Sequence, residues 1–169
     1  MTKKVLLLLN ARREWFAPGE AATEAVATIR RALSYAREQC WSIVHAHDVN
    51  KAATVRGAIE GLEPHSGEPL IVLTRQNALA LLSEEAFAGA RLYLAGAVFS
   101  RAGLATALAA PDFGCKIAFI EDAVLPCAEA VSVRPKMIPP VIWPVRSSVL
   151  FGADSAIVNF VDLRAREPR

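Results

Sequence analysis

The sequence is poor in cysteine and has no long apolar run, and each shortage excludes a class of protein. Its three cysteines, Cys40, Cys115 and Cys127, are an odd number and no two of them have CxxC spacing. This pattern predicts reduced thiols, as in a cytoplasmic protein, rather than a disulfide framework. No apolar run approaches the roughly 20 residues that a membrane span requires. We therefore expect a cytoplasmic protein that does not enter a membrane.

An excess of charge of one sign is also lacking. The 169 residues include 19 lysines and arginines and 17 acidic residues, which leaves a formal net charge of +2. This balance gives no electrostatic reason to expect nucleic acid or an anionic membrane as a partner. The chain contains neither a Walker A sequence nor a G-x-G-x-x-G fingerprint, and we predict no cofactor.

Short apolar runs alternate with helical patterns along the chain. The first run, Val5–Leu9, is too short for the apolar region of a signal peptide and is typical of a strand covered on both faces. Further strands are predicted at Trp41–Ala46, Leu70–Leu73, Leu92–Ala95, Ile117–Ile120 and Val149–Phe151. Helices are predicted after Pro18, around Ile59 and Leu62, around Leu79 and Leu82, over Ser100–Ala110 and over Ala153–Phe160. This alternation predicts an α/β fold with three αβα layers and a mostly parallel, doubly wound sheet of about six strands.

The whole chain, 1–169, is predicted to form a single domain. Its core covers about residues 4–123, and a C-terminal strand and helix cover about 147–161. Between them lies a proline-rich arm at about 126–146, which cannot be a regular helix. The arm is apolar, so we expect it to pack either on its own domain or on a neighbouring subunit. Hydrophobic residues make up 53% of the chain, and this surplus favours a homo-oligomer, a dimer or tetramer.

In such sheets, ligands bind beyond the carboxyl ends of the strands. Four segments near those ends carry recognisable patterns: Val5–Phe16, Pro64–Arg75, Leu94–Ala107 and Gly114–Ala123. Their order and spacing resemble the isochorismatase-like cysteine hydrolases, a superfamily that includes nicotinamidases and N-carbamoyl amidohydrolases. The resemblance covers about residues 4–123. It implies the same fold and, because members are commonly oligomeric, it also favours an oligomer.

The resemblance further implies a catalytic triad, but all three of its positions carry another residue in this chain. Asn10 stands where the family has Asp, Arg75 where it has Lys and Ala102 where it has the nucleophilic Cys, whereas Phe16 matches the family's aromatic residue. A methyl group cannot attack a carbonyl carbon, a carboxamide cannot act as a base, and a guanidinium stays protonated. We therefore predict a non-catalytic protein with a binding, regulatory or structural role.

The alternative is a hydrolase of small amides or related metabolites that uses a displaced nucleophile or base. Ser100 lies two residues before Ala102, although its spacing to Gly103 is that of a helix N-cap. His45 and His47 point to the same face of a strand and could supply a base or, with Asp48, a metal site. Nicotinamidases in the family have an Asp-x-His at about this place, but Asn50 replaces that histidine. We predict no metal.

A small anionic ligand is a further expectation. Arg75 is predicted to lie beside the amino terminus of the helix that begins near Ser100, where backbone N–H groups and a guanidinium suit a carboxylate or phosphate. Asn10 and Phe16 would line the same cleft. Alternatively, Arg75 forms an ion pair with Asp48 or Glu14 and closes the pocket.

Overall fold

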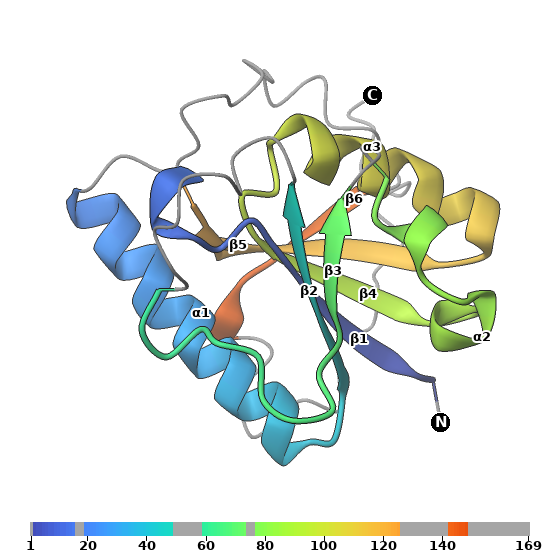
Figure 1. Cartoon of the computed structure of the whole chain (residues 1–169), viewed down its shortest axis with the longest axis horizontal. Coiled ribbons are helices and arrows are strands. Elements are labelled where there is room, and N and C mark those ends of the chain that lie inside the picture. Colours follow the sequence, from blue (N-terminus) through green and yellow to red (C-terminus); the bar gives the residue numbers. More distant parts are fainter. Residues whose placement is uncertain (1, 16–18, 49–58, 74–76, 126–141, 149–169) are drawn as a thin grey trace, which may run out of the picture.

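The centre of the molecule is a six-stranded sheet. A computed structural model describes residues 2–15, 19–48, 59–73, 77–125 and 142–148 (Figure 1). The strand order is β3-β2-β1-β4-β5-β6, and every neighbouring pair of strands runs parallel. The strands are β1 (Lys4–Leu9), β2 (Ser42–Asp48), β3 (Leu70–Leu73), β4 (Arg91–Gly96), β5 (Lys116–Val124) and β6 (Ile142–Val145). The predicted α/β fold with a parallel, doubly wound sheet of about six strands is confirmed.

Helices cover both faces of this sheet (Figure 1). On one face lies α1 (Glu20–Glu38), and on the other lie α2 (Glu84–Phe87) and α3 (Arg101–Ala109). Three short 3-10 helices complete the described elements: η1 (Arg13–Trp15), η3 (Leu79–Leu81) and η4 (Ala110–Phe113).

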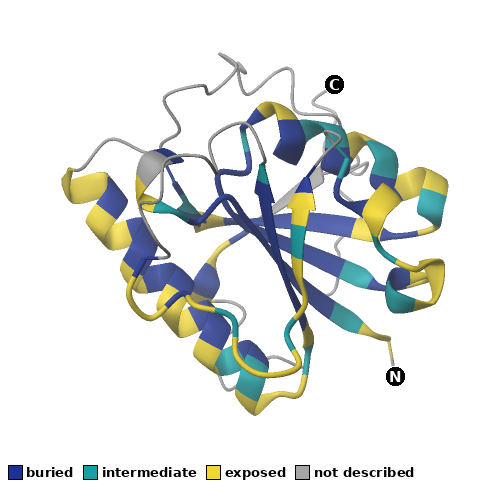
Figure 2. Cartoon of the chain, in the orientation of Figure 1, coloured by how far each residue is buried: buried dark blue, intermediate teal, exposed yellow. Residues whose placement is uncertain are grey.

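The apolar residues of β1 contribute to two hydrophobic cores, one on each face of the sheet. Successive strand residues point to opposite faces, so Leu6 and Leu8 pack against α1, whereas Leu7 and Leu9 join the core under α2 and α3. Figure 2 shows the central strands buried along most of their length. The uniform apolarity of this run is therefore the expected consequence of a sheet that is covered on both sides.

The predicted elements match the observed ones closely, with one exception inside the described core. The helical pattern around Ile59 and Leu62 is a turn where the structure describes it. Gly61 has a φ of +80° there, a left-handed conformation that a helix interior does not allow. The local spacing of two apolar residues reflected their burial and not a helical period.

A second difference concerns the proline-rich arm. We expected this segment to be irregular, yet its end, Ile142–Val145, is the sixth strand and pairs with β5. A proline removes one backbone donor, but among the described strands β6 is the last in the sheet and pairs only with β5, so Pro144 is tolerated there. The rest of the arm before residue 142, and the predicted strand Val149–Phe151 and helix Ala153–Phe160, lie outside the described residues. Among the helices that are described, none is long and apolar enough to span a membrane.

Candidate functional site

A doubly wound sheet places its ligands beyond the carboxyl ends of the strands where the strand order reverses, which in this sheet is between β1 and β4. The two strand ends are in direct contact, since the Ala97 N–H donates to the Leu9 carbonyl at 2.8 Å. Gly96 has a φ of +89°, and a Cβ on it would lie 2.2 Å from the Leu9 carbonyl oxygen. Only glycine therefore allows the chain to leave β4 so close to the end of β1.

Asn10 directly follows β1 at this carboxyl edge of the sheet. Its side chain is fully buried, and its φ of 46° is a left-handed conformation that asparagine adopts more readily than most residues. Its Oδ1 accepts a hydrogen bond from the Asp48 N–H at 2.7 Å, which ties the ends of β1 and β2 together. Its Nδ2 makes no hydrogen bond to any described residue. The carboxamide thus leaves one buried donor unused at the predicted site.

Helix α3 begins shortly after β4 ends at the same edge of the sheet. Ser100 is its N-cap, as its spacing to Gly103 predicted: the Ser100 Oγ accepts a hydrogen bond from the Gly103 N–H at 3.2 Å. Ala102 lies in the first turn, and its methyl group is packed in the core under α3. The Thr106 hydroxyl donates a hydrogen bond to the Ala102 carbonyl at 2.7 Å, and the Thr106 Oγ1 accepts one from the Ala78 N–H at 2.9 Å. This helix start is firmly anchored.

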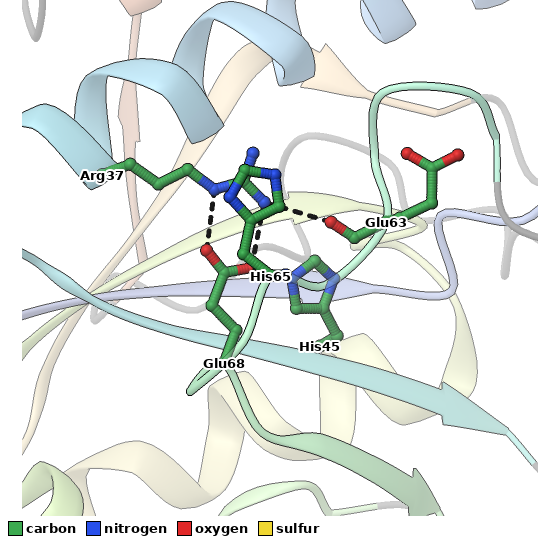
Figure 3. Close-up of polar contacts among 5 residues, drawn as sticks. All are labelled: Arg37, His45, Glu63, His65 and Glu68. Carbon is green, nitrogen blue, oxygen red and sulfur yellow. Dashed lines mark hydrogen bonds and ion pairs between the residues drawn. The ribbon is translucent and has the colours of Figure 1, made fainter.

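The two histidines of β2 lie on the α1 side of the sheet. His45 is fully buried, and its Nε2 lies 2.9 Å from Glu68 Oε2. Glu68 also forms a two-pronged ion pair with Arg37 of α1, at 2.7 and 2.9 Å, and accepts the His65 N–H at 2.9 Å (Figure 3). Burial by itself raises the pKa of Glu68, but these donors outweigh it and lower the pKa to about 2. Glu68 therefore remains a carboxylate near neutral pH.

Both histidines are neutral near pH 7. Burial lowers the pKa of His45 and outweighs the opposing effect of Glu68. Burial, followed by the charge of Arg12, lowers the pKa of His47 to about 4. The Nδ1 atoms of both rings are buried without a hydrogen-bond partner in the described part of the chain. No group of three or more metal-ligating side chains occurs among the residues that the structure describes.

Asn10 and the start of α3 both follow strands that end at the carboxyl edge of the sheet, whereas the His45 ring contacts Glu68, which pairs with Arg37. Arg75, Phe16 and Asn50 lie outside the described residues, as do the alternative ion pairs proposed for Arg75. Sequence reasoning missed the cluster of Arg37, His45 and Glu68. Its only signal was a charged Arg37 outside the apolar stripe of α1, which by itself indicates a solvated side chain.

The cysteines do not supply the thiol that Ala102 lacks. Cys115 directly precedes β5, and its Sγ donates to the Phe87 carbonyl at 3.2 Å. Burial raises the pKa of its thiol, which disfavours the reactive thiolate. Cys40 is exposed after α1 and has no disulfide partner among the described residues, and Cys127 lies outside them.

No family model matches the chain, and neither does any curated protein sequence. Solved structures do match. An isochorismatase from Pseudomonas putida is 23% identical with a TM-score of 0.65, over 88% of this chain and 92% of that one. An isochorismatase family protein from Desulfovibrio vulgaris is 21% identical with a TM-score of 0.64, over 92% and 98%. N-carbamoylsarcosine amidase from Thermoplasma acidophilum is 16% identical with a TM-score of 0.63, over 86% and 97%. The chain therefore has the isochorismatase-like fold.

Proposed function

We propose that this protein is a non-catalytic member of its fold that binds a small anion in the crevice between β1 and β4. The observation that carries the proposal is the methyl group of Ala102 in the first turn of α3, where the family that the sequence resembles has its nucleophile. This side chain is 2% exposed and belongs to the core. It offers no atom that can attack a carbonyl carbon, and in a well-studied serine protease loss of the nucleophile costs on the order of 10⁶ in rate.

The candidate replacements are occupied elsewhere. The Ser100 hydroxyl caps α3 and is 1% exposed, and no described carboxylate or histidine hydrogen-bonds to it. A serine without an adjacent base is a weak nucleophile. The His45 ring is committed to Glu68 on the α1 side of the sheet. These contacts support a binding role over a displaced hydrolase mechanism.

Asn10 supports an anionic ligand. Where an aspartate would place a negative charge, the Asn10 carboxamide places a neutral group with an unused donor. The first N–H groups of a helix such as α3 have no acceptor within the helix, and its dipole favours negative charge. A carboxylate or phosphate would then be held by Asn10, the start of α3 beside Ser100 and, in our proposal, Arg75 and Phe16.

An activity panel tests the catalytic half of the proposal. Nicotinamide, N-carbamoyl amino acids and isochorismate are offered to the wild type and to Ser100→Ala and His47→Ala variants. We expect no turnover above the uncatalysed rate in any of them. Turnover by the wild type that disappears in either variant would establish the displaced-nucleophile alternative instead.

Calorimetric titration tests the binding half. We expect phosphate or acetate to bind the wild type, and Arg75→Ala and Asn10→Asp to weaken binding by about tenfold each, because each removes a donor to the anion or adds a like charge. The exposed Lys116, at the amino end of β5, provides a charge-matched control as Lys116→Ala. Equal, featureless traces for the wild type and Arg75→Ala would remove the anion site.

A further inference from the structure

A pocket lies at the amino ends of the strands, at the opposite end of the sheet from Asn10. It has a volume of about 480 Å³, within the usual range for pockets that hold small organic molecules. It opens at the amino ends of β1 and β2, between the loop before β3 and helix α2. Its walls include Lys3, Val44, Ser66, Glu68 and Phe87.

The short length of β3 creates this pocket. β3 begins at Leu70, opposite His45, so the first residues of β2 have no β3 residue beside them. The N–H and C=O of alternate strand residues point to the same side, and His45 donates its N–H toward β3, to the Pro69 carbonyl at 2.9 Å. The Ile43 N–H and C=O therefore point into the gap, and no described residue pairs with them there. The pocket wall thus offers one backbone donor and one backbone acceptor.

The loop on the far side of the gap is held in place by α1. Arg37 donates to the Glu63 carbonyl at 3.1 Å and forms the ion pair with Glu68 (Figure 3). Arg30 donates to the Glu60 carbonyl at 2.9 and 2.6 Å. These contacts hold the loop against α1, while its end meets β2 only at His45, so the gap beside Ile43 is part of the fold.

The floor of the pocket is apolar and its rim is basic. Val5, Val44 and Phe87 are buried parts of one hydrophobic core, and Leu82 and Ala86 pack against the same core. At the rim, the Lys3 Nζ donates to a neutral group, the Glu85 carbonyl at 3.2 Å. No carboxylate in the described part of the chain lies within ion-pair distance of Lys3.

The one acidic side chain in the wall does not offset this charge. Both oxygens of Glu68 are engaged by donors from Arg37, His45 and the His65 N–H. The charge of Glu68 is therefore matched within the protein, whereas the ammonium of Lys3 has no carboxylate partner in the described part of the chain. An apolar body that carries a carboxylate fits such a pocket, and an amide next to the carboxylate would match the free edge at Ile43.

We propose that this pocket binds a small carboxylate with an apolar body, of the chemical class of acylated hydrophobic amino acids. The carboxylate pairs with Lys3, the amide pairs with the open edge of β2 at Ile43, and the side chain lies over Val44 and Phe87. The site is separate from the crevice between β1 and β4, and it holds whether or not that crevice binds an anion.

The test is a titration of isotope-labelled full-length protein, followed by amide chemical shifts, with three matched probes. N-acetyl-phenylalanine has all the expected features, N-acetyl-phenylalaninamide lacks the charge, and 3-phenylpropionate lacks the amide. We expect saturable shifts at the amides of Ser42–Val44 and Ser66–Gly67 with the first probe. N-acetyl-phenylalaninamide, which lacks the charge, should bind about tenfold more weakly than N-acetyl-phenylalanine. The loss of affinity for 3-phenylpropionate should be smaller, because hydrogen bonds to charged groups are stronger than those between neutral groups.

Two variants locate the binding. Lys3→Ala, at an exposed position, removes the charge, and Ala86→Phe fills the hollow without changing any charge. We expect each variant to weaken the binding of N-acetyl-phenylalanine to this pocket by about tenfold. Lys116→Ala and Asn10→Asp should leave that affinity unchanged. The proposal is overturned if no saturable shift appears at tens of millimolar ligand, or if the shifts persist unchanged in both Lys3→Ala and Ala86→Phe.

Discussion

At the scale of single residues, two polar side chains, Asn10 and Glu68, connect elements that are far apart in the sequence. Asn10 joins two strand ends through one oxygen, and Glu68 collects donors from a helix, a strand and a loop. Each is held by partners that lie far away along the chain. A substitution at either position therefore tests contacts between elements as well as the local conformation.

Asn10→Ala is expected to lower the free energy of unfolding by about 2 kcal/mol. It removes the Asn10 Oδ1 that accepts from the partly buried Asp48 N–H, and it puts a less tolerant residue at a positive φ. Asn10→Gly removes the same hydrogen bond without the backbone strain. We expect the glycine variant to be the more stable of the two in urea unfolding. Equal stability of Asn10→Ala and the wild type would contradict the role given to this side chain.

The buried histidines make the protein sensitive to acid. The pKa of His47 falls from 6.5 to about 4 on folding. Between these pH values His47 is protonated in the unfolded chain but neutral in the folded protein. Stability from this group is complete above pH 6.5 and is lost as the pH falls from 6.5 to 4, by at most about 3 kcal/mol. His45, whose pKa is also lowered, acts in the same direction.

Urea unfolding at pH 7, 5.5 and 4 measures this loss. We expect His47→Gln to lose less stability than the wild type over the window, because glutamine does not titrate. His65→Gln is the matched control, since this side chain is exposed in a turn, and it should follow the wild-type profile. A His47→Gln profile parallel to that of the wild type would show that His47 does not carry the effect.

At the scale of elements, close approaches decide where each strand and helix can lie. Gly96 brings β4 against the end of β1, and Asp122 of β5 accepts the Ser147 N–H at 2.9 Å just beyond β6. Burial by itself raises the pKa of Asp122, but its hydrogen bonds with Ser147 outweigh that effect and keep the pKa below its usual value. The carboxyl edge of the sheet is therefore held by contacts that run between neighbouring strand ends.

Helix α3 depends on one such approach at Gly103. A Cβ there would lie 2.0 Å from the Val98 carbonyl oxygen, so Gly103→Ala must displace backbone. Alanine favours a helix by about 1 kcal/mol over glycine, but we expect the clash to dominate, with a net loss of about 2 kcal/mol or more. Gly19→Ala is the control, since it begins α1 with open space around its Cβ. A stabilised Gly103→Ala protein, measured by thermal unfolding, would mean that α3 is not held against Val98.

At the scale of the whole molecule, apolar surface remains on the outer strand β3. Leu70 and Val72 are 53% and 50% exposed there, although edge strands are usually protected by charge. Together with the apolar composition, this surface favours the homo-oligomer that we expect, a dimer or tetramer.

Light scattering coupled to size-exclusion chromatography decides the oligomeric state. We expect a mass at least twice the chain mass of 18.2 kDa. Val72→Lys should lower the mass if the β3 edge is part of the contact, whereas Leu108→Lys, a similarly exposed site on α3, should not. A wild-type mass of 18.2 kDa would rule out the oligomer.

The sequence by itself determined the architecture of this protein. Five strands and the two long helices follow from runs such as Val5–Leu9 and from the apolar stripe that Ile29 and Leu33 form on α1, because the period of burial along a chain reports its local conformation. The places of Asn10 after β1 and of Ser100 and Ala102 at the start of α3 were also predictable, since these positions follow from the bounds of the elements.

Only the tertiary structure decided which distant side chains meet. One example is the cluster of Arg37, His45 and Glu68, which are separated by up to 31 positions in the sequence. They meet because α1 packs over β2 and the loop before β3 lies beside both. A strand is possible at Ile142–Val145 because an edge position tolerates proline. The pocket at Ile43 forms because β3 begins opposite His45, two residues further along β2 than Ile43. Periodicity records whether a residue is buried, but not what it is buried against, because packing between elements depends on the path of the whole chain.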